Sequence, residues 1–326
     1  MNRTIDIFAT LGERLSNFGK ESSSQEVIRR AMEQNEWFTF DDIMLAVDAI
    51  RVEFLDREKL QRWAAGYSQQ TSKRVAIIMA GNIPLVGFYD LMCVVMAGHK
   101  ALVKPSSKDK VLMEWIIGKL RDICPTIAIE PYTELSAIEM AIATGSDEAA
   151  RHFRTRYNGL PTIIRGSRHS LAVLGQKESK TDMEGLSKDI FSHNGLGCRN
   201  VSLIFLPRGA ELNITPPPSD SPMMRGNYLQ NRALKSMLGI PFKDLGGHIM
   251  VESNDFSDKV SQINYCYYDK LSDVESWIAA HDDKIQCVVS NIIDHPRCVE
   301  FGRAQYPTLW DVADGVDVMK FLTQER

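Results

Sequence analysis

The 326-residue sequence has no excess of basic residues. Its 38 lysines and arginines are outnumbered by 42 aspartates and glutamates, which gives a formal net charge of -4. A protein that holds nucleic acid through phosphate contacts needs a basic surface. The charge balance therefore argues against a DNA- or RNA-binding protein.

Long apolar runs are also missing, because charge or glycine interrupts every apolar stretch before it reaches membrane-spanning length. The first residues, Met1-Asn-Arg-Thr-Ile-Asp6, lack the apolar core of a secretory signal peptide. We therefore expect no membrane span and a cytoplasmic location.

The six cysteines contain no CxxC pair, which argues against a zinc ribbon and a thioredoxin-type redox site. His295 and Cys298 have a spacing that could hold a metal, but two ligands without visible partners are more typical of a surface turn. The sequence predicts no metal site. It also shows no internal repeat and no low-complexity segment.

A hydrophobic content of 44% and a charged content of 25% are those of an ordinary globular protein. The chain is longer than one hydrophobic core normally serves, so we expect two lobes.

Residues 1 to about 70 are predicted to be helical. Ser23–Glu26 and Thr39–Asp42 both match a capping box, in which a hydroxyl and an acid three residues later satisfy the amides of a helix's first turn. Apolar residues then recur at helical spacing. This segment is expected to cover a sheet face or a subunit contact, which leaves a homo-oligomer open.

A strand, a tight turn, a helix and a second strand follow from Arg74 to Lys104, and they predict a βαβ unit with parallel strands. Two polar loops, Gly81–Pro84 and Lys104–Ser107, come directly after the two strands. Ligands of such sheets bind at the carboxyl ends of the strands. Each loop by itself is also explained by simple turn chemistry.

The pattern continues with a helix over 108–124, a strand over 126–129 and an apolar strand from Met140. That strand turns through Gly145-Ser146 into a helix, where Ser146 is a plausible N-cap and the helix N-terminus could attract a phosphate. Asp147 and Glu148 oppose a phosphate because acids already complement the helix dipole. Two strand-like halves follow between Pro161 and Leu174.

Arginines are concentrated in this part of the chain, where they form either a solvated face or a phosphate site. They are Arg151, Arg154, Arg156, Arg165 and Arg168.

The stretch Asp189–Asn200 places Cys198 among small and polar neighbours, just before an apolar run over 201–206 that predicts a buried strand. Gly195 and Gly197 allow close approach of the backbone to a bound carbonyl. Cys198 is therefore either a presented nucleophile or a small buried hydrophobe. His193 is either a proton donor or an ordinary hydrogen-bonded histidine.

The remaining sequence predicts a second α/β lobe. Strands are expected at 249–252, 263–268 and 285–290, helices at 227–238 and 273–281, and an alternating strand over 316–322 at the end.

These loops, in this order, resemble the aldehyde dehydrogenase superfamily, and within it the acyl-CoA reductases similar to the fatty-acid reductase of bacterial luminescence. Gly81-Asn82-Ile-Pro84 is similar to the Asn-x-Pro loop, Lys104-Pro-Ser to the Lys-Pro-Ser loop and Thr144-Gly-Ser146 to the Thr-Gly-Ser turn. Gly197-Cys198 falls at the family's nucleophile. Residues 301–305 and 314–322 are similar to the closing segment of the luminescence-type reductases.

The resemblance implies a two-lobed fold with a Rossmann-type parallel sheet and a second α/β catalytic lobe. It also implies a helical segment over 1–72, a nicotinamide-cofactor domain over 73–187, a catalytic domain over 188–300 and a return segment over 301–326. Cys198 would be the nucleophile, and Asn82 and the cysteine's own amide would bind the oxyanion. Lys104, Ser106, Ser107, Gly145 and Ser146 would contact the cofactor.

The implied activity is reduction of an acyl-CoA substrate to a fatty aldehyde through an acyl-Cys198 thioester. Hydrolytic relatives carry a glutamate base in a Glu-Leu-Gly-Gly segment, but Ile164-Arg165-Gly166-Ser167 stands here, so water should not be activated. A hydroxyl at Ser107 and a cation at Lys108 favour NADPH, with NADH as the alternative. A cysteine acyltransferase or thioesterase without a redox step, and a non-catalytic family member, stay open.

Overall fold

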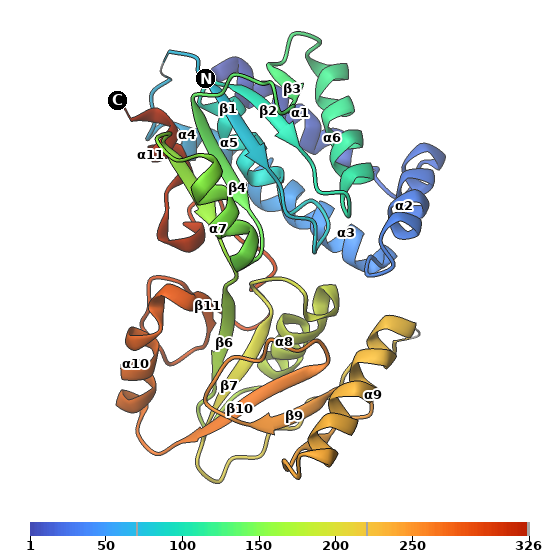
Figure 1. Ribbon diagram of the computed structural model, residues 1–326, viewed down its shortest axis with the longest axis vertical. Helices are drawn as coiled ribbons and strands as arrows, with labels where there is room; N and C mark the ends of the chain where they lie inside the picture. The colour runs from blue at the N-terminus through green and yellow to red at the C-terminus, as the bar shows by residue number, and fades with distance from the viewer. Residues whose placement is uncertain (70, 220, 325–326) are drawn as a thin grey trace. The chain divides into compact units, whose positions relative to one another are not determined.

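The computed structural model describes residues 1–69, 71–219 and 221–324 (Figure 1). The chain divides into two compact units, of which the first comprises Met1–Ser167 and Tyr306–Arg326 and the second Arg168–Gln305. Each unit contains a sheet of mainly parallel strands covered by helices, which confirms the predicted two-lobed α/β fold. From the sequence we expect four functional segments of the chain, which begin at residues 1, 73, 188 and 301. The two compact units do not test these boundaries, so the four segments stay a prediction.

Helices make up the N-terminal part of the first unit, as predicted. They are α1 (Asn2–Leu15), α2 (Ser22–Gln34), α3 (Phe40–Ala49), a π-helical turn (Ile50–Phe54) and α4 (Arg57–Ala64). Thr39 caps α3, since its Oγ1 accepts the Asp42 N–H at 3.1 Å. The capping box predicted at Ser23 is wrong. Helix α2 already includes Ser22, and the Ser24 hydroxyl donates to the Glu21 carbonyl at 2.9 Å.

The first unit's sheet has the strand order β3-β2-β1-β4-β5, and all its pairings are parallel. The strands are β1 (Arg74–Ile78), β2 (Lys100–Lys104), β3 (Ile129–Pro131), β4 (Met140–Thr144) and β5 (Thr162–Arg165). The helices between them are α5 (Phe88–Met96), α6 (Lys110–Ile123) and α7 (Asp147–Arg156). Strand β3 lies about three residues later than predicted, with its apolar Ile129 at the start.

Both faces of this sheet are covered. Val75 and Ile77 pack into a large core with the N-terminal helices, α5 and α6, whereas Ala76 between them packs into a smaller core with Phe153 and Tyr157 of the α7 region. Figure 1 shows α7 lying against β4. Because side chains cover both faces, a ligand can approach the sheet at the strand ends.

The second unit's sheet has the order β12-β11-β6-β7-β10-β9-β8, in which only β8 is antiparallel among the described strands. The strands are β6 (His169–Val173), β7 (Val201–Pro207), β8 (Lys243–Asp244), β9 (Ile249–Glu252), β10 (Gln262–Tyr268), β11 (Ile285–Val289) and β12 (Cys298–Val299). The two strand-like halves predicted at 161–174 are β5 and β6, which belong to different sheets.

Helices cover both faces of the second sheet as well. They are α8 (Lys180–Phe191), α9 (Pro222–Met237) and α10 (Leu271–Ala280). Ile204 and Leu206 of β7 pack with α8, and the alternate residues Leu203 and Phe205 pack with α10. Figure 1 shows α8 and α10 on opposite sides of the strands.

The alternating strand predicted over 316–322 is wrong, because this segment forms helix α11 (Val318–Thr323). Asp317 caps the helix by accepting the Lys320 N–H at 2.8 Å. The buried residues fit a helical face as well as an alternating pattern. They are Val318, Met319, Phe321 and Leu322.

Candidate functional site

The loops after β1 and β2 lie in contact at the carboxyl edge of the first sheet, where the sequence placed them. The Met79 N–H donates to the Lys104 carbonyl at 3.1 Å. Gly81 packs so closely that a Cβ there would lie 2.5 Å from Ser106 Cβ, so this position requires glycine. Asn82 follows at the exposed bend of the turn.

The three residues proposed for the cofactor in the Lys104 loop differ in their surroundings. Lys104 and Ser107 are exposed, while Ser106 is half-buried. The Ser106 Oγ accepts the Lys108 N–H at 3.3 Å, so its hydroxyl closes the loop as turn chemistry predicts. The loop thus holds Lys104 and Ser107 toward solvent at the sheet edge.

The turn after β4 has the predicted N-cap. Ser146 Oγ accepts the Ala149 N–H at 3.3 Å and begins α7. A Cβ on Gly145 would lie 2.8 Å from Ala149 Cβ, which explains the glycine. Asp147 Oδ1 accepts the Ser167 N–H at 2.8 Å, so this turn is joined to the loop after β5.

Arg165 does not belong to a solvated face, because it is buried at the end of β5. Its Nη1 and Nη2 donate to the two oxygens of Asp90 at 2.7 and 3.1 Å, and Nη1 also reaches Thr144 Oγ1 at 3.4 Å. Burial acts to lower the pKa of Arg165, but the neighbouring carboxylates of Asp90 and Asp314 act in the opposite direction, and the pKa is raised. Arg156 pairs separately with Glu134. The arginines therefore do not form one cluster.

In the second unit, helix α8 leads into the Cys198 loop. Its first turn has a full capping box between Ser179 and Asp182, which the sequence analysis missed. After Phe191 the chain passes through three consecutive left-handed residues, His193 (φ 52°), Asn194 (φ 55°) and Gly195 (φ 71°). Left-handed backbone is uncommon outside glycine, so other contacts must hold this turn.

Asn200 supplies those contacts. Its Nδ2 donates to the carbonyls of Asp189, Ile190 and Ser192 at 3.2, 3.2 and 2.8 Å, and its Oδ1 accepts the Gly197 N–H at 2.8 Å. The side chain is buried. One amide therefore ties the end of α8 to the residue before Cys198. Asn200 lies in the stretch Asp189–Asn200 that the sequence analysis singled out. An asparagine at this position does not by itself indicate that its side chain holds the loop.

Cys198 is exposed, in agreement with a presented thiol. Its carbonyl accepts the Ser170 hydroxyl at 2.8 Å, which fixes the loop to the start of β6. Asn200 N–H donates to the Gly197 carbonyl at 3.0 Å just before β7 begins. The thiol thus stands on a short loop that is held on both sides.

Asp189 connects α8 to the closing motif at 301–305. Its carboxylate accepts the Gly302 and Ala304 N–H groups at 2.6 and 3.0 Å. Burial raises the pKa of Asp189 to about 6, although these hydrogen bonds and Arg199 oppose the rise. Gly185 allows the close approach, because a Cβ there would lie 2.7 Å from the Phe301 carbonyl carbon.

Histidines of the second unit include His193, His248 and His295. His193 is buried in the left-handed turn. His248 packs edge-on against Phe191 with ring centroids 4.8 Å apart, and burial lowers its pKa to about 4. His295 Nε2 lies 3.2 Å from Asp282 Oδ1, which Arg297 also contacts. Across the described ranges, no group of three or more His, Cys, Asp or Glu side chains could hold a metal ion.

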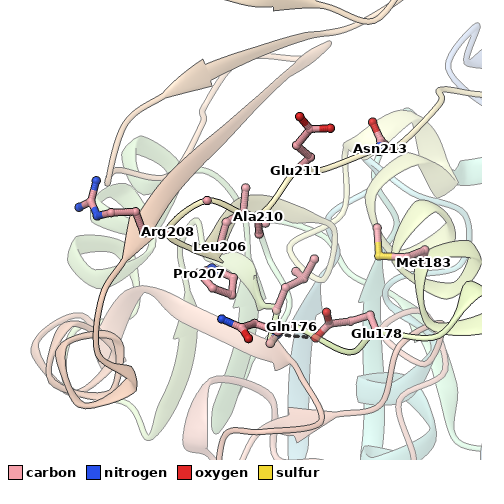
Figure 2. A pocket seen from close by; sticks show the side chains of 12 residues that line it. Gln176, Glu178, Met183, Leu206, Pro207, Arg208, Ala210, Glu211 and Asn213 are labelled. Atoms are coloured by element: carbon pink, nitrogen blue, oxygen red, sulfur yellow. Dashed lines mark hydrogen bonds between the residues drawn. The ribbon is translucent and has the colours of Figure 1, made fainter.

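A pocket of about 450 Å³ opens in the second unit, at the carboxyl ends of β6 and β7 (Figure 2). Its lining includes Gln176, Glu178, Met183 and Arg208. The Glu178 carboxylate is used locally, since it accepts the Gly175 N–H. Cys198 lies just before the start of β7, whereas the pocket lies at the carboxyl end of the same strand.

None of the helices in residues 1–69, 71–219 and 221–324 combines the length and apolar character that a membrane crossing requires.

Solved aldehyde dehydrogenases share this fold. The enzyme from Physcomitrella patens in complex with succinate superimposes with a TM-score of 0.68 at 9% identity, over 98% of this chain and 83% of that chain. The Bacillus cereus enzyme in complex with NAD+ gives 0.61 at 12% identity, over 88% and 71%. The Mycobacterium tuberculosis enzyme complexed with NAD+ gives 0.60 at 14%, over 96% and 78%. No curated protein matches the sequence.

The chain therefore has the fold of aldehyde dehydrogenases. Residues 46–215, just over half of the chain, match the family model described as acyl-CoA reductase (LuxC), and the chain belongs to this family. The matched region contains the four motifs from the Asn82 turn to Cys198, and the closing segments at 301–305 and 314–322 lie outside it. The predicted family is confirmed.

Proposed function

We propose that the protein reduces an acyl-CoA thioester to the aldehyde with NADPH, through a covalent acyl-Cys198 intermediate. The observation that carries the proposal is the exposed Cys198 thiol on a loop fixed by Asn200 and Ser170, within the part of the chain that matches the acyl-CoA reductase family. An exposed thiol on a rigid loop suits a nucleophile, since little reorganisation is needed before attack.

In the first step the Cys198 thiolate attacks the thioester carbonyl carbon, forms a new C–S bond and expels the CoA thiolate, which then takes up a proton. The negative charge that develops on the carbonyl oxygen needs fixed N–H donors. We assign the Cys198 amide and the Asn82 carboxamide to this role. The Gly197 N–H already donates to Asn200 Oδ1, so it is not offered to the oxyanion. On this loop the N–H of Cys198 itself is the better donor for that role.

The second step needs a hydride donor, which a bound nicotinamide supplies. The first unit fits such a group, because its strand order is that of a dinucleotide-binding sheet and its loops meet at the carboxyl edge. The residues that would hold it are Lys104, Ser106, Ser107, Gly145 and Ser146. The Asp147 carboxylate accepts a hydrogen bond from the Ser167 N–H and is engaged there. Ser146, which caps α7, is therefore the residue at the helix start that we assign to the cofactor.

After hydride addition, the tetrahedral oxyanion on Cys198 collapses, breaks the C–S bond and releases the aldehyde, so that the thiolate is regenerated. The segment at 164–167 supplies no base that could activate water. Its one charged side chain, Arg165, is a buried cation paired with Asp90. An acyl-enzyme should therefore hydrolyse slowly and wait for the hydride.

The test is to mix enzyme and an acyl-CoA without cofactor, and then to add NADPH. About one CoA per active site should be released in a burst, and peptide mass analysis should find the acyl group on Cys198. NADPH should then discharge it as aldehyde with loss of nicotinamide absorbance. A panel of acyl chain lengths in the same assay would identify the preferred substrate.

Cys198→Ala should abolish both the burst and the reduction. Cys266→Ala is the matched control, because this half-buried cysteine lies in the same unit and its thiol donates to the neighbouring Tyr267 carbonyl. Steady CoA release without cofactor would replace the reductase with a thioesterase. An acyl group on another cysteine would exclude Cys198 as the nucleophile.

A further inference from the structure

Asp109 occupies the N-cap position of α6 but does not cap its own helix. The amide of Val111 in the first turn is satisfied from a distant part of the chain, since it donates to Gln34 Oε1 at 3.2 Å. The neighbouring Asn35 Nδ2 donates to the Lys108 carbonyl at 3.3 Å. The end of α2 thus supports the start of α6 and leaves the Asp109 carboxyl for another contact.

That contact is with the turn after β1. Asp109 Oδ2 accepts the Leu85 N–H at 2.8 Å. Leu85 has a left-handed backbone (φ 56°), a conformation that costs a leucine of order 1 kcal/mol unless its surroundings hold it. A Cβ on Gly81 would lie 3.1 Å from Asp109 Cβ, so the turn packs on this residue at both ends.

The carboxyl group is almost completely buried, at 1% exposure. No hydrogen-bond partner of its Oδ1 is found in the part of the chain that the structure describes. Burial raises the pKa of Asp109 well above its usual range, although the Leu85 N–H opposes this. A neutral acid with one engaged oxygen is a group that asparagine can replace, whereas an apolar side chain cannot accept the Leu85 N–H.

We propose that Asp109 is a positioning residue that holds the Gly81–Leu85 turn, and with it Asn82, against the Lys104–Lys108 loop. The assignment of Asn82 as an oxyanion donor rests on the function proposed above, but the contact between Asp109 and the turn does not. Asp109 thereby ties the oxyanion turn to the loop proposed to bind the cofactor, since it directly follows that loop.

The experiment compares Asp109→Asn, Asp109→Ala and Asp109→Leu, the last of which keeps the branching at Cγ and provides a second acceptor-free variant if alanine fails to fold. Asp56→Ala is the matched control, because Asp56 is an N-cap of the same unit that does cap its own helix, accepting the Lys59 N–H at 2.9 Å. Two quantities are measured on folded protein: amide hydrogen exchange over residues 79–88, and the rate of cofactor-free CoA release.

The acceptor-free variants should exchange the amides of the turn about tenfold faster and release CoA about tenfold more slowly, as expected for one lost hydrogen bond. Asp109→Asn should stay within about threefold of wild type in both, and NADPH binding should hardly change because Ser106 still closes its own loop. Asp56→Ala should lose stability without either effect.

Native exchange in the turn of a folded Asp109→Ala or Asp109→Leu variant would overturn the proposal. So would an Asp109→Asn variant that behaves like the alanine. If wild type itself releases no CoA, the proposed function fails, and the exchange measurement alone then decides the role of Asp109.

Discussion

Arg165 and Asp90 form a buried two-pronged ion pair, with Nη1–Oδ2 and Nη2–Oδ1 distances of 2.7 and 3.1 Å. The pair joins the end of β5 to the first turn of α5. A third charge is near, since Arg165 Nε lies 3.9 Å from Asp314 Oδ2 in the closing motif. Residues 164–167 stand where hydrolytic relatives carry a glutamate base. In this protein the segment instead carries the Arg165 cation, which holds the end of β5 against α5.

Breaking this pair from one side should be costly. Arg165→Met leaves Asp90 buried without its cation and should reduce the free energy of unfolding by about 3–5 kcal/mol. The double variant Arg165→Met/Asp90→Leu should lose less, because no buried charge is left alone. Denaturant unfolding of the single and double variants measures the difference.

Arg29→Met is the control for this series, because Arg29 pairs with Glu26 at 2.6 Å in the same unit but both side chains are more than half exposed. It should cost much less than Arg165→Met, because solvent screens an exposed pair. An equal loss in the single and double Arg165 variants would show that the pair is not coupled.

Asn82 is predicted to contribute to turnover rather than to folding. Asn82→Ala should remove one donor to the oxyanion and lower turnover by about 10²-fold, the range seen for comparable donors. Asn158→Ala, another exposed turn position of the same unit, should leave the rate unchanged. A variant of Asn82 that melts earlier but keeps its rate per folded molecule would make Asn82 a turn residue only.

The preference for NADPH is predicted to depend on Lys108. This residue is exposed beside the Lys104 loop, where a cation should attract a 2'-phosphate. Lys108→Glu should raise the KM for NADPH by about tenfold and leave the KM for NADH nearly unchanged. Lys110→Glu, two residues further along, is the control. Equal or better efficiency of wild type with NADH would contradict the preference.

The sequence correctly predicts those strands and loops whose signal lies in a short stretch of neighbouring residues. Strand β2 lies over Lys100–Lys104 as predicted, and β7 and β9 begin at the predicted residues, because buried parallel strands are continuous apolar runs bounded by turn residues. Polar loops after such strands also predict the carboxyl edge, and the Gly81 and Lys104 loops do meet there.

Contacts between distant residues could not be predicted in this way. Gln34 bonds to Val111, which lies 77 positions later, and this contact makes Asp109 differ from an ordinary N-cap. The sequence places Arg165 in either a solvated face or a phosphate site and does not reveal the buried ion pair, since its partner Asp90 lies 75 residues earlier. Residues 318–322 fit both a strand and a helix pattern, and the Asp317 cap decides for the helix. Tertiary partners determine the first two outcomes, whereas the third depends on the local contact between Asp317 and the Lys320 N–H.

Asn200 is predicted to be essential to the shape of the Cys198 loop. Asn200→Asp replaces an amide that donates to three carbonyls with an oxygen that repels them, and should cost about 2 kcal/mol or more. The rate of Cys198 alkylation by a small thiol reagent should change in the folded variant. Asn254→Asp, at an exposed position of the same unit, is the control. An unchanged stability and alkylation rate would contradict the role of Asn200.

Asp189 is predicted to make stability depend on pH. Its pKa is about 6 in the folded protein because of burial, against about 4 in an unfolded chain. The folded state therefore binds the proton more tightly, so this group's contribution to the free energy of unfolding is greatest below about pH 4 and declines as the pH rises to about 6. Asp189→Asn removes the titration. The difference in unfolding free energy, wild type minus variant, should fall by up to about 3 kcal/mol between about pH 4 and pH 7. A difference that stays constant over this range would show that the buried carboxyl does not titrate there.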